Sequence, residues 1–444
     1  MKGWRRPFPA TIASTGLLLP SAVAETEALS SIGLSRAGSM DPRREALLER
    51  DHLTGDWRGA RQRWLEQGVT LHGEWIGEFW ANFSGGVDTG VVAEGLAQLN
   101  LDLDLQRLVG WRGAEVRLGG ILPHGESPTG ELTGDLLGVS NIDAFRDEIA
   151  PYEVWWQQSD VTDAWNLRAG LLVADGEFAF TEGGSAFLNS AFGWPAGIAL
   201  NTRNTGPAYF RSSLGIRLRQ TVSESWQWQV GVYDGDTFDG DPDHDPVASW
   251  SLGGDDGWFL IGEIARWRVG SGEASRGLHV RCGGWLHTAA FDEADSETSR
   301  GGVFLAADYE LWSDSLRAAQ PGTEAAAEDD SGFALSMFGR LEWAPQKFSS
   351  VEWSGHGGWF LEGLLPARFD DAIGLGVAWA RGSDRESAED PGGFPSEIAL
   401  ELTWRISLTR FWEIQPDYQW ILDVGGDSER KPAHLFGIRT HLTF

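Results

Sequence analysis

The stretch that decides the fold is Leu435–Phe444, with the sequence LFGIRTHLTF. Its residues alternate with a period of two between an apolar side and a more polar side, which is typical of a β-strand with one apolar face. The apolar side carries Phe436, Ile438, Thr440, Leu442 and Phe444. A free apolar edge invites aggregation unless another strand covers it. We therefore expect this strand to pair with the first strand and to close a barrel.

The terminal residue Phe444 is compatible with two kinds of closed sheet. An aromatic residue at the end of such a strand resembles the insertion signal of bacterial outer-membrane barrels. The alternative is an ordinary closing strand of a soluble barrel or sandwich. The rest of the chain has to decide between them.

Composition narrows the class of protein. The 444 residues suffice for one large barrel or for two or three soluble domains. A net charge of -30 argues against nucleic acid as a partner, because phosphate binding needs a basic surface. Cys282 is the one cysteine, so the chain can form no intramolecular disulfide. The 24 tryptophans against 5 tyrosines suit both membrane interfaces and sugar-stacking platforms.

The N-terminal region predicts export. Three basic residues precede a moderately apolar run at 8–19, and Ser21–Ala24 has the small residues of a cleavage site. We interpret residues 1–24 as a signal peptide and expect the mature chain to begin near Glu25. Residues 25–52 form a polar leader with a short predicted helix starting at Asp41-Pro42. After the signal peptide no run of 18 apolar residues follows, so a helical membrane span is not expected.

A clearer short helix is predicted before the strands begin. Asp56 can cap it, Trp57, Ala60 and Trp64 lie on one stripe, and Gly68 can end it. The two tryptophans could plug a lumen or cap the base of a barrel, whereas simple packing is the alternative. We place the boundary of the barrel domain at residues 53–444.

From Gly68 onward the pattern has a period of two. The clearest case is 98–105, where Leu99, Leu101, Leu103 and Leu105 alternate with Gln98, Asn100, Asp102 and Asp104. Further strands are expected to start near Leu71, Val116, Tyr152, Trp165, Tyr209, Trp226, Phe259, Leu278, Val303, Phe333, Val351, Ala372, Ile398 and Phe411. With the last strand the count is about sixteen, within the range of membrane barrels.

The joints between these strands alternate between short and long. Examples of short joints are 159–164 and 221–225, whereas 123–150 and 173–207 are long. Tight turns on one side and loops on the other are expected for a membrane barrel. The joint at 313–332 breaks this rhythm. The joint at 173–207 is rich in glycine and aromatic residues, so we expect it to fold inward, with a surface loop as the alternative.

The second face of the strands is too polar for the core of a soluble protein. It carries Glu74, Asp102, Asp104, Arg117, Arg168, Arg217, Gln227, Gln229, His279, Arg281, Glu401 and Arg439. Burying many unpaired ions in a dry core costs several kcal/mol for each ion. A water-filled lumen removes that cost. The fold class predicted is therefore an all-β transmembrane antiparallel barrel with a short N-terminal helical segment.

Several sequence blocks occur in order along the chain. They are LTGDWRGAR (53–61), LNLDLDLQRLVGW (99–111), GVSNI (138–142), EVWWQQ (153–158), LNSAFG (188–193), VYDGD (232–236), GLLPARFDD (363–371) and IQPDYQWI (414–421). With these blocks the chain resembles the carbohydrate-selective porins of the OprB type. The resemblance implies a sixteen-stranded barrel in the bacterial outer membrane that passes sugars by diffusion.

The resemblance has one departure. Sugar-selective members tend to carry Arg-Asn-Gly near the end of the third strand, with the arginine at the narrowest point. The matching place here reads Leu122-Pro-His-Gly125. This difference bears on selectivity for glucose-type sugars and leaves the porin interpretation intact.

A porin needs no catalytic group, cofactor or metal, so the candidate residues are those that could contact a sugar. Selectivity is expected from rings of charge and aromatic platforms at a constriction. The candidates are Glu74, Asp102, Arg117, Trp155, Arg168, Phe210 and Arg217, each with a plain solvated wall residue as its alternative. Arg168 and Arg217 are expected to point inward and to be solvated, with Phe210 at the mouth end of the strand that carries Arg217. These groups predict a preference for neutral sugars over anions.

Three further expectations concern partners and alternatives. The acidic stretch 234–245 fails the EF-hand pattern, so we predict no metal site there. The outer surface is expected to contact outer-membrane lipid and lipopolysaccharide, and the oligomeric state stays open, with a homo-oligomer as one alternative. The competing functions are a secreted β-rich glycan hydrolase, which would use two carboxylates, and a plugged, non-conducting barrel.

Overall fold

The computed structural model describes residues 50–143, 147–162, 164–238, 252, 256–268, 277–289, 299–313, 333–347, 349–363, 371–383 and 396–444. The signal peptide, nearly all of the leader with its first helix, most of the acidic stretch at 234–245 and nearly all of the joint at 313–332 lie outside these residues.

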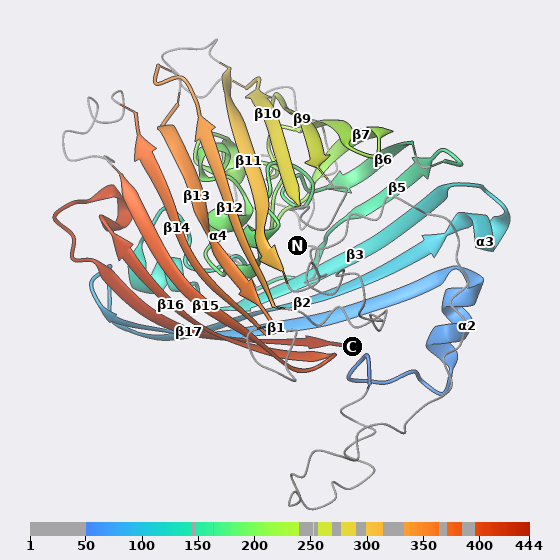
Figure 1. Cartoon of the computed structure of the whole chain (residues 1–444), viewed down its shortest axis with the longest axis horizontal. Helices are drawn as coiled ribbons and strands as arrows, with labels where there is room; N and C mark the ends of the chain where they lie inside the picture. The colour runs from blue at the N-terminus through green and yellow to red at the C-terminus, as the bar shows by residue number, and fades with distance from the viewer. Residues whose placement is uncertain are drawn as a thin grey trace, which may run out of the picture.

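One antiparallel sheet forms the wall of a barrel (Figure 1). It closes because β1 (Val69–Ser84) pairs on one side with β2 (Gly90–Asp104) and on the other with β17 (Ala433–Thr443). The strands between them are β3 (Ala114–Gly125), β4 (Ala150–Pro151), β5 (Val154–Ser159), β6 (Trp165–Leu172), β7 (Ser213–Ser223), β8 (Trp226–Asp234), β9 (Trp258–Arg268), β10 (Leu278–His287), β11 (Arg300–Ser313), β12 (Ala334–Trp343), β13 (Val351–Glu362), β14 (Ala372–Gly382), β15 (Glu397–Thr409) and β16 (Trp412–Leu422).

The number of strands agrees with the number predicted from the sequence. The sheet has 17 strands, but β4 and β5 both pair with β3 and are two halves of one position, so the described wall has sixteen positions. The closing role of the last strand is confirmed, since Ile438 lies opposite Phe79 and the Phe444 N–H donates to the Gly73 carbonyl at 2.8 Å.

The alternation predicted from the sequence sets the two faces of the wall. Leu99 is 55% exposed on the outside, whereas its neighbours Gln98 and Asn100 are buried on the inside. The same outward exposure of apolar side chains occurs all around the barrel, at Phe79, Leu118, Ile216, Ile264, Leu305, Leu341, Leu375, Leu402 and Ile438. An exposed apolar belt around a polar interior is the arrangement of a barrel in lipid.

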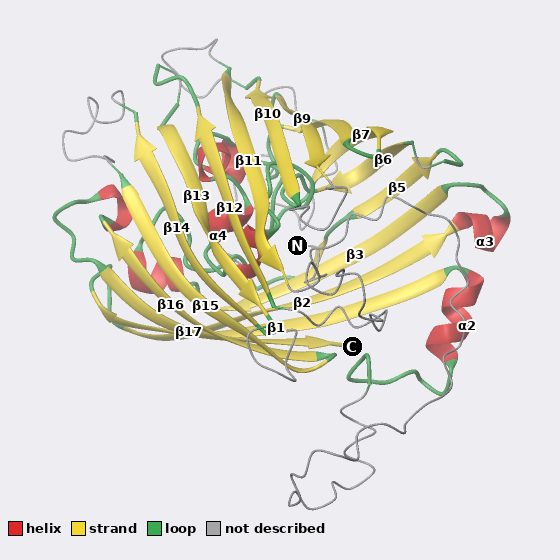
Figure 2. Ribbon diagram, in the orientation of Figure 1, coloured by secondary structure: helices red, strands yellow, loops and turns green. Residues whose placement is uncertain are grey.

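The two ends of the barrel differ (Figure 2). One end, the turn end, holds tight connections such as Glu224–Ser225 between β7 and β8, and also the end of β17. The other, the loop end, holds the long connections at 126–149 and 173–212. Exposed tryptophans lie near both ends, as expected for aromatic girdles at membrane interfaces, with Trp111, Trp165, Trp226, Trp312 and Trp412 at the turn end and Trp258, Trp343 and Trp420 at the loop end.

The helices are short and lie in the connections and before β1. They are α2 (Ala60–Gln67), α3 (Leu105–Val109), α4 (Ser190–Gly193), α5 (Ala196–Ala199), a π-helical turn η1 (Thr129–Thr133) and the 3-10 turns η2 (Gly183–Ala186), η3 (Arg203–Thr205) and η4 (Val424–Gly426).

The start of α2 corrects one prediction. The helix begins at Ala60 with Gly59 as its N-cap and no side-chain cap, so the expectation that Asp56 caps it is wrong. Asp56 instead accepts the Gly59 N–H with its backbone carbonyl at 3.0 Å. Trp57, with φ 50°, precedes the helix, whereas Gly68 ends it as predicted with φ 90°.

Candidate functional site

The loop between β6 and β7 fills part of the barrel interior (Figure 1). The prediction that 173–207 folds inward is confirmed, because Phe178, Phe187 and Phe192 of this loop are buried against the wall. Phe187 and Phe192 stack with their ring centroids 4.4 Å apart. Gly376 of β14 makes room for them, since a Cβ there would lie 2.7 Å from the Phe192 ring.

Carboxylates of the wall hold this loop by its backbone. Glu401 of β15 accepts hydrogen bonds from the N–H groups of Leu188 at 2.6 Å and Asn189 at 3.0 Å. Backbone N–H groups inside a barrel need acceptors, and a carboxylate has room for several. Further wall carboxylates that accept loop N–H groups in this way are Glu263, Asp308 and Glu342.

The loop between β3 and β4 also folds inward, which the sequence did not predict. Glu397 of β15 accepts the N–H groups of Leu136 and Leu137, both at 2.9 Å. The loop contains Asp143, which accepts a hydrogen bond from the Ser127 hydroxyl at 2.6 Å. Burial raises the pKa of Asp143 to about 6.

The two inward loops bind each other. The Asn141 N–H donates to the Leu188 carbonyl at 2.7 Å, and the Ser190 N–H donates to the Gly138 carbonyl at 2.9 Å. Gln419 of β16 joins both loops to the wall, since its amide donates to Val139 O at 2.8 Å and accepts from Asn189 Nδ2 at 3.2 Å. The blocks GVSNI and LNSAFG of the sequence are therefore the two surfaces of one contact.

Arginines of β6 and β7 surround one carboxylate of the inward loop. Glu177 forms ion pairs with Arg168 at 2.5 Å, with Arg217 at 2.5 Å and with Arg219 at 3.0 Å. Arg168 also lies over the Trp155 ring, with its Cζ 4.0 Å from the ring centroid. Both Arg168 and Arg217 point inward, as predicted.

The predicted solvation of these two arginines is wrong. Only 1% of Arg217 and 9% of Arg168 are exposed, because Glu177 and the loop that carries it cover them. Phe210 also differs from its prediction, since it lies in the loop before β7 and not on that strand. The adjacent Tyr209 hydroxyl donates to the Ile142 carbonyl at 2.7 Å, which ties this part of the chain to the other inward loop.

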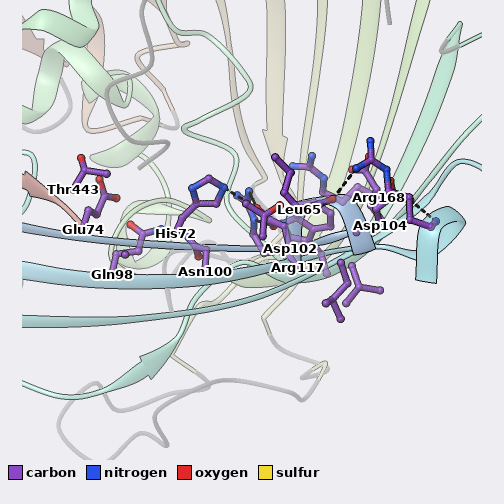
Figure 3. Close-up of a pocket in the computed structure, with 18 of the residues that line it drawn as sticks. Leu65, His72, Glu74, Gln98, Asn100, Asp102, Asp104, Arg117, Arg168 and Thr443 are labelled. Carbon is purple, nitrogen blue, oxygen red and sulfur yellow. Dashed lines mark hydrogen bonds and ion pairs between the residues drawn. The ribbon is translucent and has the colours of Figure 1, made fainter. Parts of the chain in front are cut away.

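A cavity of about 590 Å³ lies at the turn end of the lumen, against β1, β2, β3, β5, β6 and β17 (Figure 3). Five of the seven candidate residues line it, namely Glu74, Asp102, Arg117, Trp155 and Arg168. Arg217 and Phe210 do not line it. The structure thus brings most of the predicted residues to one place.

Within this cavity the charged groups are paired and ordered. Arg117 makes a two-pronged contact with Asp102, at 2.6 and 2.9 Å, and reaches Glu153 at 3.3 Å. His441 of β17 lies 3.0 Å from Glu74. The arrangement offers fixed donors and acceptors beside an indole, which suits a ligand with polar edges and an apolar face.

Sequence reasoning missed Glu177, Glu153 and His441. Glu177 lies in a loop, where no strand alternation indicates which way a side chain points. Glu153 interrupts the strand between β4 and β5 with φ 57°, so its phase could not be read from its neighbours. His441 lies on the polar side of the last strand, but its partner Glu74 lies 367 residues away in the chain.

His124 belongs to the stretch Leu122-Pro-His-Gly125, which departs from the Arg-Asn-Gly of the family. Its ring lies over Gly95 of β2, where an added Cβ would be 2.7 Å from Nε2. Its Nδ1 is 3.2 Å from the Leu122 carbonyl.

Within the described ranges, no group of three or more His, Cys, Asp or Glu side chains is arranged to hold a metal ion. No helix in the described part of the chain is long and apolar enough to span a membrane.

A closed sixteen-position antiparallel barrel with an apolar outer belt, a charged lumen and loops folded inward is a channel of the porin class in the bacterial outer membrane. Comparison with known proteins identifies the family. The chain belongs to the family described as "Carbohydrate-selective porin, OprB family", whose profile matches residues 89–444.

One relative and two solved structures are similar to this chain over most of its length. Porin B of Pseudomonas aeruginosa is 24% identical over 438 residues, which cover 88% of this chain and 91% of that protein. The high-pH structure of Pseudomonas putida OprB has a TM-score of 0.74 at 20% identity, covering 89% of this chain and 99% of that one. The low-pH structure of the same protein has a TM-score of 0.56 at 18% identity, with the same coverage.

These findings settle the class of protein. The porin family and the fold indicate a channel, and nothing in them supports the alternative of a secreted hydrolase. The predicted outer-membrane location is confirmed by the family.

Proposed function

We propose that this porin passes small neutral sugars and similar polar solutes, and that they bind on the way in the 590 Å³ lumen cavity. The observation that carries the proposal is the convergence of Glu74, Asp102, Arg117, Trp155 and Arg168 around that cavity. Sugars have hydroxyl groups on their edges and C–H patches on their faces. Ordered carboxylates and guanidinium groups match the hydroxyls, and an indole matches a face.

Preference for neutral solutes follows from the balance of charge. The cavity lining carries carboxylates at Glu74, Asp102, Asp104 and Glu115 as well as arginines at 107, 117 and 168. An anion that enters meets both signs, so it gains little over a neutral solute. The overall charge of -30 further disfavours anions.

None of these groups is proposed to act catalytically, and no cofactor or metal is required. The exposed apolar belt is proposed to contact outer-membrane lipid and lipopolysaccharide. The number of copies in the membrane is a separate question.

The test is sugar block of ion current through single channels in planar bilayers. Trp155→Ala, and separately Arg168→Ala, should weaken the block, because both residues line the cavity. Trp111→Ala is the matched control, since Trp111 lies at the turn end but does not line the cavity.

Each outcome has a clear meaning. If sugars never block the wild-type current, or if they block the variants as strongly as wild type, these residues take no part in sugar binding. Any binding site for sugar then lies elsewhere. If the wild type conducts no ions at all, the barrel is plugged by its inward loops, and the transport function is wrong.

A further inference from the structure

A second cavity, of about 550 Å³, lies next to the lumen cavity at the turn end of the barrel. Its wall is made by residues 50–65, before and within α2, and by the beginning of β1. Leu65, Thr70 and His72 line both cavities. The two cavities therefore adjoin each other at these three residues.

The segment that forms this cavity is anchored to the barrel. Arg61 Nε donates to the Gly55 carbonyl at 2.9 Å, and its Nη1 donates to the Leu71 carbonyl of β1 at 3.3 Å. The Leu53 N–H donates to the Thr443 carbonyl of β17 at 2.9 Å. The cavity thus has a defined wall, held on two neighbouring strands.

Two tryptophans of this wall are only partly packed. Trp57 and Trp64 contact edge to face, with centroids 5.7 Å apart, and Arg61 covers one face of Trp57 at 4.0 Å. Trp64 remains 41% exposed although it lines the cavity. The contacts with Trp64 and Arg61 explain the position of Trp57. The indole of Trp64, by contrast, keeps part of its surface free to contact a ligand.

A histidine of the same wall has an unused polar atom. Nδ1 of His52 is buried and has no hydrogen-bond partner among the described residues. Burial, with Arg61 second, lowers the pKa of His52, so the imidazole is neutral at pH 7. A neutral imidazole can donate or accept a hydrogen bond, depending on its tautomer.

We propose that this cavity is a second carbohydrate-binding site, which receives a sugar as it leaves the lumen and holds its face on Trp64 and a hydroxyl on His52. Asp56 and Gln62, which also line it, add an acceptor and an amide for further hydroxyls. The proposal rests on the proposed passage of sugars through the lumen. It assigns to the segment before the barrel a role in transport at the turn end, which is the periplasmic side in outer-membrane barrels.

The test measures sugar block of the ion current with sugar added on one side of the bilayer at a time. Trp64→Ala and His52→Ala should each weaken the block by sugar added at the turn end by about threefold to tenfold, the size expected for one lost aromatic contact. The same variants should change the block by sugar added at the loop end much less. Trp64→Phe should retain most of the wild-type block.

Trp111→Ala is the control, because Trp111 is also exposed at the turn end but lines neither cavity. If wild type is blocked by sugar while Trp64→Ala and His52→Ala behave as wild type from both sides, the second site is overturned and the lumen proposal stands. If sugar does not block wild type from either side, the proposed function fails first. Heat-modifiable migration in gels shows that each variant is folded.

Discussion

Glu177 and Arg217 form a closely packed ion pair inside the barrel, with 2.5 Å between Oε2 and Nε and only 5% and 1% of their side chains exposed. Nη2 of Arg217 also donates to Oε1 of Glu177 at 3.2 Å. Because Arg168 and Arg219 pair with the same carboxylate, one negative charge is shared by three positive charges. The inward loop thereby sets the charge of this part of the lumen.

Replacing this carboxylate should change ion selectivity. Glu177→Gln leaves three arginines without their shared counterion, so we expect the reversal potential in a salt gradient to shift toward anions. Removing one partner of a buried pair typically costs about 3–5 kcal/mol, so the folded barrel should also melt at a lower temperature. Glu224→Gln, an exposed acid in a tight turn, is the control. An unchanged reversal potential would show that these arginines do not face the ion path.

Gln419 should be needed for both inward loops at once. The side chain is fully buried and bonds to Val139 of one loop and Asn189 of the other. Gln419→Leu leaves a carbonyl and an amide unsatisfied, at about 1–3 kcal/mol each.

We expect hydrogen exchange to speed up together in 138–142 and 188–193. Gln346→Leu in the connection between β12 and β13 is the matched control, since the Gln346 amide donates to Glu352. Faster exchange in only one loop would contradict the joint role.

Docking of the loop at 126–149 should weaken as the pH rises toward neutral. The pKa of Asp143 is raised from 3.8 to about 6 in the folded protein, chiefly by burial. Between these two values the undocked loop has already lost the proton that the docked loop keeps, so stability falls with rising pH and the penalty is complete above pH 6.

Asp143→Asn removes this penalty, so amides of the loop should exchange more slowly than in wild type at pH 7, by an amount on the order of 1–3 kcal/mol. The difference should disappear near pH 4. Asp147→Asn, an exposed acid in the same loop, should show neither effect. Equal protection of wild type and Asp143→Asn at pH 7 would refute the assignment.

Loss of the last strand should prevent assembly. β17 pairs with β1 and with β16, so deleting 433–444 exposes the backbone groups of two edges in the membrane, where each unsatisfied group costs several kcal/mol. We expect no folded, heat-modifiable protein from the deletion and a strong loss from Phe444→Ala. Phe436→Leu, which keeps an apolar side chain on the lipid face, should assemble normally. A normal yield of the folded deletion would mean that the barrel closes without β17.

The sequence by itself determined the barrel, its closure and the direction of most wall side chains. A strand between lipid and a polar lumen has to alternate apolar and polar side chains. The pairs Leu99 and Gln98, and Ile216 and Arg217, therefore show which side chain faces lipid and which faces the lumen without knowledge of the neighbouring strands. The same local pattern placed Glu74, Asp102 and Arg117 inside, and the ordered sequence blocks indicated the family.

Only the tertiary structure decided what those inward side chains contact. Glu401 meets the N–H of Leu188 across 213 positions of sequence, and Glu177 meets Arg217 from a loop with no periodic pattern. Alternation tells which way a side chain points but not which loop will reach it. The solvated arginines predicted from the sequence are therefore buried ion pairs, because the path of a loop inside the barrel depends on hydrogen bonds to distant strands that no local pattern contains.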